Sequence, residues 1–161
     1  MTMQLTPKHD LYDQIATQLS SLLAGERDLV ANAANFAALV FHSLPDLNWA
    51  GFYFVKNGEL VLGPFQGKPA CMRIAFGRGV CGVAAAKRAT TIVPNVHEFP
   101  GHIACDMESK SEIVIPLMKG GHFIGVLDLD SPLPARFDDA DAAGLETLLK
   151  ILLASTGTDA S

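Results

Sequence analysis

The sequence predicts an α+β fold in which a mainly antiparallel sheet is flanked by N- and C-terminal helices. Three observations support this prediction. Apolar residues recur at helical spacing near both ends of the chain, aromatic and β-branched residues dominate its middle, and two glycine-containing turns separate strand-like segments there. With 161 residues, 49% of them hydrophobic, the chain can build a single core, and we expect residues 1–161 to form one domain.

Helices are expected near both ends of the chain. Thr6-Pro7 marks the start of the first, with Thr6 as N-cap, and Gly25 ends it. A second helix runs from about Arg27 to Pro45, and a third begins near Asp138. Because both terminal helices are amphipathic, we expect them to pack on one sheet face or to form a dimer contact. The apolar stripe of the first consists of Leu11, Ile15, Leu19 and Leu22.

The middle of the chain is expected to fold as two hairpins with shorter elements between them. Asn57-Gly58 and Gly120-Gly121 are the two turns, and Asn-Gly is the strongest short hairpin signal. The irregular stretch 94–110 is expected to be a loop with at most a short helix. The expected strands are 48–56, 59–65, 71–76, 90–93, 111–118 and 122–130, with a short helix over 80–87.

Charge and composition exclude several function classes. The chain has 17 acidic and 12 basic residues, and this net charge of -5 argues against a nucleic-acid-binding surface. It has no run of about 18 apolar residues that could span a membrane and no secretory signal at its start. Three cysteines without an export signal indicate reduced thiols, so we expect a cytoplasmic protein.

Residues 122–130 (HFIGVLDLD) carry two acids on a strand that otherwise resembles a core strand. Strand alternation places Asp128 and Asp130 on the same face. Clustered acids repel each other unless a metal, a Lys or Arg, or a ligand ammonium lies among them, and an α-ammonium suits a small amino acid. Alternatively, the two acids simply end the strand. The predicted faces are Ile124, Val126, Asp128 and Asp130 on one side and Phe123, Leu127 and Leu129 on the other.

The register of the second hairpin decides whether Glu112 joins these acids. A three-residue loop, Lys119-Gly120-Gly121, pairs Glu112 with Asp128 on the same face. A two-residue loop pairs Glu112 with Leu129 and directs it to the opposite face. We predict the three-residue loop.

The cysteines Cys71, Cys81 and Cys105 have different settings. Cys81 lies at a predicted helix start among small apolar residues, where it either fills space or has its pKa lowered by the helix end. Cys105 lies in the longest irregular stretch, where functional residues concentrate. Zinc is a competing interpretation, but His102 and Cys105 form the only closely spaced pair, so we expect no bound metal.

Further candidates are weaker. Alternation puts Trp49, Gly51 and Tyr53 on one face, and the glycine between two aromatic residues leaves room for a ligand. Gly77-Arg78-Gly79 before a helix is similar to an anion-binding turn but lacks the length of a phosphate loop. His9 lies on a helix and is expected at the surface or hydrogen-bonded.

Taken together, these blocks resemble the free methionine-(R)-sulfoxide reductases, which are small single-domain GAF proteins. The resemblance covers about half the chain, includes all three cysteines, and implies a GAF-like fold. The matching blocks are NWAGFY from Asn48, LVLGPFQGKPAC ending at Cys71, GRGVCG around Cys81, HIACD around Cys105, SEIVIPL from Ser111 and GVLDLDS ending at Ser131.

The resemblance implies roles for the three thiols. The thiolate of Cys105 attacks the sulfoxide sulfur, which releases methionine and leaves a sulfenic acid. Cys71 resolves the sulfenic acid as a disulfide, and thioredoxin then reduces the pair. Cys81 matches a third catalytic-site cysteine whose role varies. The resemblance implies no cofactor and leaves a homodimer open.

The resemblance also implies that Glu112, Asp128 and Asp130 bind the substrate and that Trp49 and Tyr53 form an aromatic wall. Mutual repulsion favours a proton on one of the three acids. Asp130 or Asp128 is expected to polarise the sulfoxide as the acid, and Glu112 to bind the amine. Peptide-bound methionine sulfoxide lacks this ammonium, which would explain a preference for the free amino acid. The alternatives are a non-catalytic GAF module that senses a small molecule and a metal-binding structural protein.

Overall fold

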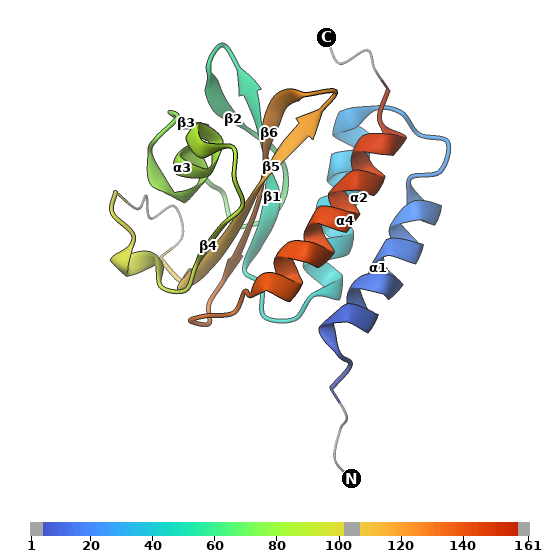
Figure 1. Ribbon diagram of the computed structural model, residues 1–161, viewed down its shortest axis with the longest axis horizontal. Helices are drawn as coiled ribbons and strands as arrows, with labels where there is room; N and C mark the ends of the chain where they lie inside the picture. The colour runs from blue at the N-terminus through green and yellow to red at the C-terminus, as the bar shows by residue number, and fades with distance from the viewer. Residues whose placement is uncertain (1–4, 102–106, 158–161) are drawn as a thin grey trace.

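An antiparallel sheet with the strand order β3-β2-β1-β6-β5-β4 forms the centre of the structure (Figure 1). The computed structural model describes residues 5–101 and 107–157. The expected α+β fold is confirmed in these ranges. The strands are β1 (Trp49–Lys56), β2 (Glu59–Gly67), β3 (Arg73–Ile74), β4 (Thr91–Val93), β5 (Ser111–Lys119) and β6 (His122–Ser131). The helices are α1 (Lys8–Leu22), α2 (Leu29–Ser43), α3 (Gly79–Lys87) and α4 (Asp139–Ser155), with a 3-10 turn η1 (Val96–Glu98).

Three of these helices cover one sheet face. α2 and α4 contact the strands, and α1 packs against α4 and α2 (Figure 1). Ile15 and Leu19 of α1 are buried as expected, but Leu22 is 45% exposed and Leu23 is buried in its place. Leu23 follows Leu19 by four residues, which keeps it on the same helical stripe. The terminal helices therefore pack together on one face of the sheet.

The opposite sheet face carries α3 and a separate apolar core. Trp49, Tyr53 and Val126 from the central strands pack there with Val80 and Ala84 of α3. α3 begins after Arg78 and ends where Arg88 adopts a left-handed conformation. In Figure 1, α3 and η1 lie on this side, leaving the helical layer to the other. The site described below lies on this side of the sheet, between α3 and the strands.

The predicted register of the β5–β6 hairpin is wrong. The loop has two residues, Gly120-Gly121, both with positive φ as a type I′ turn requires. A bulge at Ile124 adds one residue to β6, so Glu112 lies opposite Asp130 rather than Asp128. Because the bulge restores the alternation, Glu112 and Asp128 still share a face.

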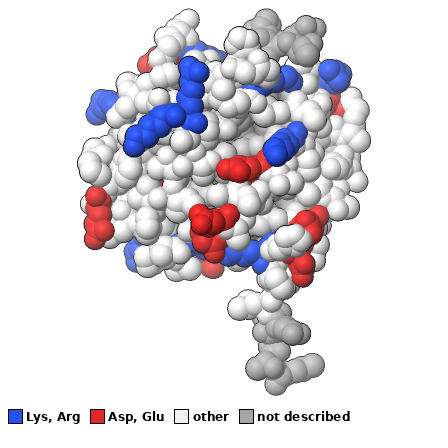
Figure 2. Space-filling model, viewed as in Figure 1, with Lys and Arg blue, Asp and Glu red and all other residues white. Residues whose placement is uncertain are grey.

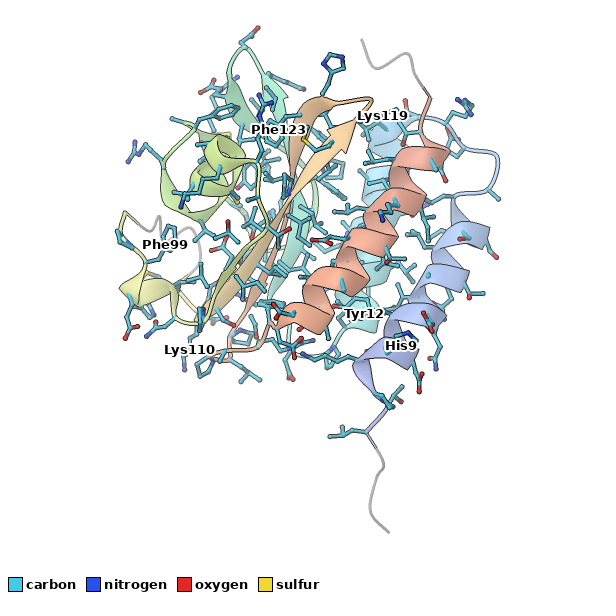
Figure 3. The ribbon with its side chains drawn as sticks, in the orientation of Figure 1. His9, Tyr12, Phe99, Lys110, Lys119 and Phe123 are labelled. Atoms are coloured by element: carbon cyan, nitrogen blue, oxygen red, sulfur yellow. The ribbon has the colours of Figure 1, made fainter. Side chains whose placement is uncertain are left out.

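The same bulge exchanges the predicted faces of two residues at the start of β6. Phe123 packs with the α3-side core, and Ile124 packs with the helical core. The Phe123 ring contacts Phe76, and the Arg88 guanidinium lies over it at 5.6 Å; Figure 3 shows Phe123 on the α3 side. An inserted residue reverses the facing of every residue before it, because strand side chains alternate. The faces predicted from Val126 onward are unaffected.

The N-terminal end of α4 is joined to α1 by a buried carboxylate. Asp141 is 1% exposed and accepts a hydrogen bond of 2.8 Å from the Tyr12 hydroxyl. Lys8 Nζ lies 2.7 Å from Asp141 Oδ2, and the Arg136 guanidinium lies 3.3 Å from the same oxygen. Figure 3 shows Tyr12 on α1 facing α4. Burial raises the pKa of Tyr12, and the Asp141 charge adds to this effect, so the hydroxyl remains a donor.

The other end of α4 is capped by a lysine from the β5–β6 hairpin. Lys119 Nζ donates to the backbone carbonyl oxygens of Leu153, Thr156 and Gly157 at 2.7–3.2 Å (Figure 3). A cation at this position satisfies carbonyls that have no partner within the helix and interacts favourably with the helix dipole.

The charged side chains on the face shown in Figure 2 are mixed in sign. Lys and Arg occur there in separate groups, with Asp and Glu between and below them. Within the described ranges, no helix is both long enough and apolar enough to cross a membrane.

Candidate active site

A pocket of about 550 Å³, including its open mouth, lies between α3 and the sheet. Its walls come from the two central strands, from β5, from the first turn of α3 and from the loop that follows β2. Strand alternation explains why Trp49 and Tyr53, four apart on β1, and Asp128 and Asp130, two apart on β6, reach the pocket together. The lining residues are Trp49, Tyr53, Pro69, Ala70, Ile74, Arg78, Gly79, Val80, Cys81, Ser109, Glu112, Asp128 and Asp130.

Glu112, Asp128 and Asp130 all line this pocket. Glu112 and Asp128 are 7% and 6% exposed. Burial raises the pKa of Glu112 well above its usual range, and the charges of Asp128 and Asp130 raise it further. Burial also raises the pKa of Asp128, although hydrogen bonds from Glu112 and Cys81 oppose that shift. Burial and the neighbouring charges therefore favour the protonated form of Glu112.

The Cys81 thiol lies against this acid group. Its Sγ donates a long hydrogen bond of 3.9 Å to Glu112 Oε1, and the residue is 4% exposed. Burial raises the pKa of Cys81 well above its ordinary value, and the Asp128 and Glu112 charges raise it further. These effects outweigh the helix N-terminus, which would favour a thiolate. The raised pKa therefore favours the neutral thiol of Cys81.

The aromatic wall consists of a stack of three rings. Trp49 lies 5.2 Å from Phe65 and 6.0 Å from Tyr53, measured between ring centroids, and both pairs are stacked. The indole Nε1 of Trp49 donates to the Lys68 carbonyl oxygen at 3.1 Å. A Cβ at Gly51 would lie 2.8 Å from the Trp49 ring and would collide with Phe65. The space predicted for a ligand beside Gly51 is thus filled by Phe65, whereas Trp49 and Tyr53 do line the pocket.

The Cys71 segment adjoins the same wall. The Tyr53 hydroxyl donates to the Cys71 carbonyl oxygen at 2.8 Å, and burial raises the pKa of Tyr53, so it stays a donor. Cys71 is disulfide-bonded, whereas Cys81 is free. Cys105 and His102 lie outside the described residues. Because a cysteine in a disulfide supplies no thiolate, Cys71 is not available as a zinc ligand in this state.

Comparison with known proteins identifies the family. The GAF domain matches residues 7–153. The chain is 49% identical over 152 residues to the free methionine-R-sulfoxide reductase of Escherichia coli (strain K12), with 92% of each chain covered. The structure of free methionine-R-sulfoxide reductase from Neisseria meningitidis in complex with its substrate matches with a TM-score of 0.89 and 48% identity, covering 96% of this chain and 93% of that one. The chain belongs to the GAF-domain family of free methionine-R-sulfoxide reductases.

A further structure from this family has the same fold. The fRMsr of Staphylococcus aureus in its reduced form matches with a TM-score of 0.89 and 46% identity, covering 98% of this chain and all of that chain. The GAF-like α+β architecture expected from the sequence is thereby confirmed.

Some pocket residues of this family member were missed by sequence reasoning. Ser109 is buried and accepts a hydrogen bond of 3.0 Å from Asn48 Nδ2, but it lies in the irregular stretch that has no period. Ile74 and Val80 look like ordinary core residues in the sequence. Arg78 and Gly79 had a signal, since they form the Gly77-Arg78-Gly79 turn, which opens α3 at the pocket. None of these placements follows from local spacing.

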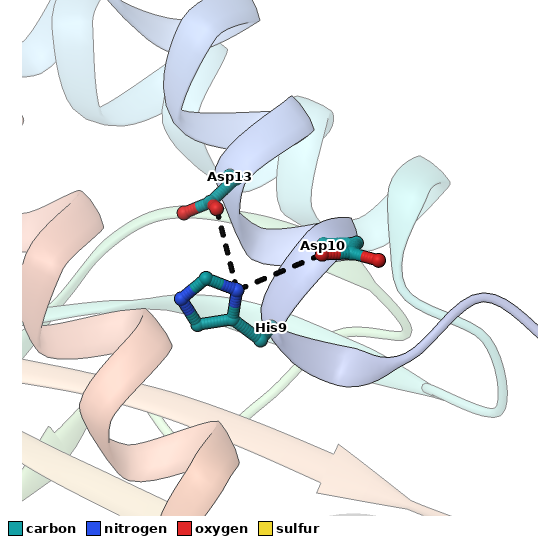
Figure 4. A group of neighbouring side chains, drawn as sticks. All are labelled: His9, Asp10 and Asp13. Carbon is teal, nitrogen blue, oxygen red and sulfur yellow. Dashed lines mark ion pairs between the residues drawn. The ribbon is translucent and has the colours of Figure 1, made fainter.

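A second group of ligating side chains lies outside the GAF pocket, on α1. His9 Nδ1 is 3.4 Å from Asp13 and 3.7 Å from Asp10 (Figure 4). All three side chains are more than half exposed, and His9 is 84% exposed. This agrees with the expectation that His9 is a surface residue, and an exposed i, i+4 pair of this kind is worth little.

Proposed function

We propose that this chain reduces free L-methionine-(R)-sulfoxide to methionine. The observation that carries the proposal is the group formed by Glu112, Asp128 and Asp130 in one pocket with an aromatic wall, in which Glu112 and Asp128 are buried. Buried acids need a cation or a proton, and a free amino acid supplies an ammonium of matching charge. The named activities of the E. coli and N. meningitidis relatives support this substrate.

The pocket offers a partner for each part of that amino acid. The α-ammonium faces Asp128, whose Oδ1 has no hydrogen-bond partner in the described part of the chain. The α-carboxylate faces the first turn of α3, whose N–H groups have no side-chain cap, and Arg78 lies beside it. The methyl sulfoxide end lies against Trp49 and Tyr53. The site therefore recognises charge at one end and apolar surface at the other.

The chemical step is a transfer of oxygen from sulfur to sulfur. The Cys105 thiolate attacks the sulfoxide sulfur and forms a transient S–S bond. The oxygen then transfers to the Cys105 sulfur as the S–S and S–O bonds to the methionine sulfur break, which leaves a sulfenic acid on Cys105 and releases methionine. One proton is consumed at the oxygen. The cysteine is oxidised and the sulfoxide is reduced, so the electrons balance.

The carboxylate group supplies that proton in this proposal. Burial and the neighbouring charges raise the pKa of Glu112 well above its usual range, which favours its protonated form. Glu112 lies opposite Asp130 across the β5–β6 ladder. The proton reaches the sulfoxide oxygen from this pair. Glu112 stores the proton, and Asp130 is the acid that contacts the sulfoxide oxygen. Asp128 then remains the anion for the ammonium.

Regeneration uses the second thiol. The Cys71 thiol attacks the sulfenic sulfur of Cys105, releases water and forms a disulfide, which thioredoxin then reduces. That Cys71 is disulfide-bonded while Cys81 is free supports Cys71 as the resolving residue. The neutral, buried Cys81 acts as part of the pocket wall rather than as a nucleophile.

The deciding experiment measures methionine release from the free (R) and (S) epimers, with dithiothreitol or thioredoxin as reductant. Turnover of the (R) epimer alone, lost in Cys105→Ser, is the expected result. If the folded and reduced protein turns over neither epimer, the reductase proposal is wrong and a ligand-sensing GAF module becomes the better account.

A further inference from the structure

Three side chains from three elements meet in the pocket in an arrangement that suits a metal ion. Cys81 of α3, Glu112 of β5 and Asp128 of β6 each present one ligand atom, and these atoms lie within 4.8 Å of one another. All three residues are buried. The Cys81 Sγ to Glu112 Oε1 distance is 3.9 Å.

This spacing is close to that of a zinc site. With Zn–S near 2.3 Å and Zn–O near 2.0–2.2 Å, the ligand atoms of a tetrahedral site lie about 3.5 Å apart. Side-chain movements of less than about 1 Å therefore close the group around one ion. Three protein ligands leave a fourth position, which faces the pocket. This is the coordination of zinc sites that exchange a water or a ligand.

An independent observation indicates that something binds here. Asp128 is 6% exposed, yet its Oδ1 has no hydrogen-bond partner in the described part of the chain. In the same ranges, no ion pair to a Lys, Arg or His side chain involves Glu112 or Asp128. A buried carboxylate oxygen without a partner is costly, so a cation in the pocket is strongly favoured.

The sulfur ligand determines which kind of cation this group of side chains can bind. Mg²⁺ and Ca²⁺ prefer sites made of oxygen alone, whereas zinc and cobalt accept a thiolate together with carboxylates. We propose that Cys81, Glu112 and Asp128 bind a thiophilic divalent cation such as Zn²⁺, and that this cation and the amino-acid substrate exclude each other. The exclusion rests on the proposed function, because both occupants use the same carboxylate oxygens. The metal site itself does not depend on it.

Cobalt binding tests the metal site without any turnover. The full-length Cys71→Ser/Cys105→Ser variant keeps Cys81 as its sole cysteine. On titration with Co²⁺ we expect one ion per chain and an intense near-ultraviolet sulfur-to-cobalt charge-transfer band, which added Zn²⁺ removes and Mg²⁺ does not. Absence of this band would overturn the proposal.

Matched variants in the same background locate the ion. Cys81→Ser and Cys81→Ala should abolish the band, and Asp128→Asn should weaken Co²⁺ binding by about 10-fold or more. Thermal melts of each variant check that it is folded. His9→Ala removes the surface group on α1 and should change nothing. Loss of binding in His9→Ala, or unchanged affinity in Asp128→Asn, would place the ion elsewhere and overturn the assignment.

Competition tests the exclusion. L-methionine sulfoxide should raise the apparent Kd for Zn²⁺ more than an equal concentration of glycine, which chelates zinc through the same groups but lacks the side chain. Equal effects of the two amino acids would overturn mutual exclusion. If the chain binds cobalt through Cys81 but reduces neither epimer, the metal site stands and the proposed reductase function fails.

Discussion

Glu112 of β5 lies directly opposite Asp130 of β6 in the antiparallel ladder, and both line the same pocket. Two acids at opposing positions of a sheet normally repel each other. Asp128 adds a third acid on the same face, diagonal to Glu112. The pocket can hold all three only if it retains a proton or receives a cation, and the raised pKa of Glu112 reflects the first of these states.

Removing the stored proton should slow catalysis. We expect Glu112→Gln to lower kcat/KM for the (R) sulfoxide by about 10²-fold or more, since general acids contribute about 10²–10⁴-fold. We would measure activity from pH 5 to 9. The activity of the unsubstituted chain should fall with rising pH as Glu112 loses its proton, and the Glu112→Gln variant should not show this fall. Asp10→Asn on the surface of α1 is the matched control and should retain full activity. Unchanged kcat and KM in Glu112→Gln would refute the role.

The same substitution should stabilise the protein at neutral and alkaline pH. Because the folded pKa of Glu112 is raised, the folded state binds the proton more tightly than the unfolded state does. The free energy of unfolding therefore falls as pH rises from the ordinary Glu pKa through the raised one. Glutamine keeps the hydrogen bond and does not ionise, so Tm of the variant at pH 8 should exceed that of the parent by about 2–4 °C, with no gain at pH 4. Calorimetric melts at both pH values measure this.

Substrate selection should depend on the α-ammonium. N-acetyl-L-methionine-(R)-sulfoxide has no positive charge to place against Asp128, and it leaves buried carboxylate oxygens unpaired. We expect its kcat/KM to be about 10²-fold lower or worse than that of the free amino acid. N-methyl-L-methionine-(R)-sulfoxide, which adds bulk at the nitrogen but keeps both the ammonium and the carboxylate, is the control for altered size. Comparable rates for the acetylated and free substrates would contradict the proposed binding mode.

The two redox thiols should separate in single-turnover experiments. Cys105→Ser should release no methionine, because the nucleophile is lost. Cys71→Ser should release about one equivalent and then stop, because the sulfenic acid is not resolved. Quench-flow measurement of methionine per chain distinguishes the two, and Cys81→Ser should show repeated turnover. A burst in Cys105→Ser would assign the attack to another thiol.

The α1–α4 contact predicts a stability effect away from the pocket. Asp141→Asn removes the buried charge that Lys8, Arg136 and the Tyr12 hydroxyl share, and should cost about 3 kcal/mol of unfolding free energy. The control is Asp138→Asn, which keeps the N-cap and loses only an exposed ion pair, and should cost less than about 1 kcal/mol. Urea unfolding curves of both variants measure the difference. Equal losses would mean that burial of Asp141 contributes nothing.

Periodicity in the sequence was sufficient for the α+β fold, the helices at both ends and the positions of the two hairpins. Asn57-Gly58 forms the two-residue turn that its composition indicates. The placement of Asp128 and Asp130 on one face followed from strand alternation, which is a local property of the backbone. The resemblance to reductases added the family and the candidate thiols.

Tertiary packing decided what local spacing left open. The bulge at Ile124 depends on how β6 aligns with β5. The sequence therefore predicted the wrong cross-strand partner for Glu112, but it placed Glu112 on the correct face of the sheet. The glycine between Trp49 and Tyr53 makes room for Phe65 of β2, a neighbour that no spacing reveals. The state of Cys81 was equally open, because the helix end and the buried carboxylates have opposite effects on its pKa. The charges at that thiol come from two strands, β5 and β6, that meet α3 in space, and only the folded chain brings them together.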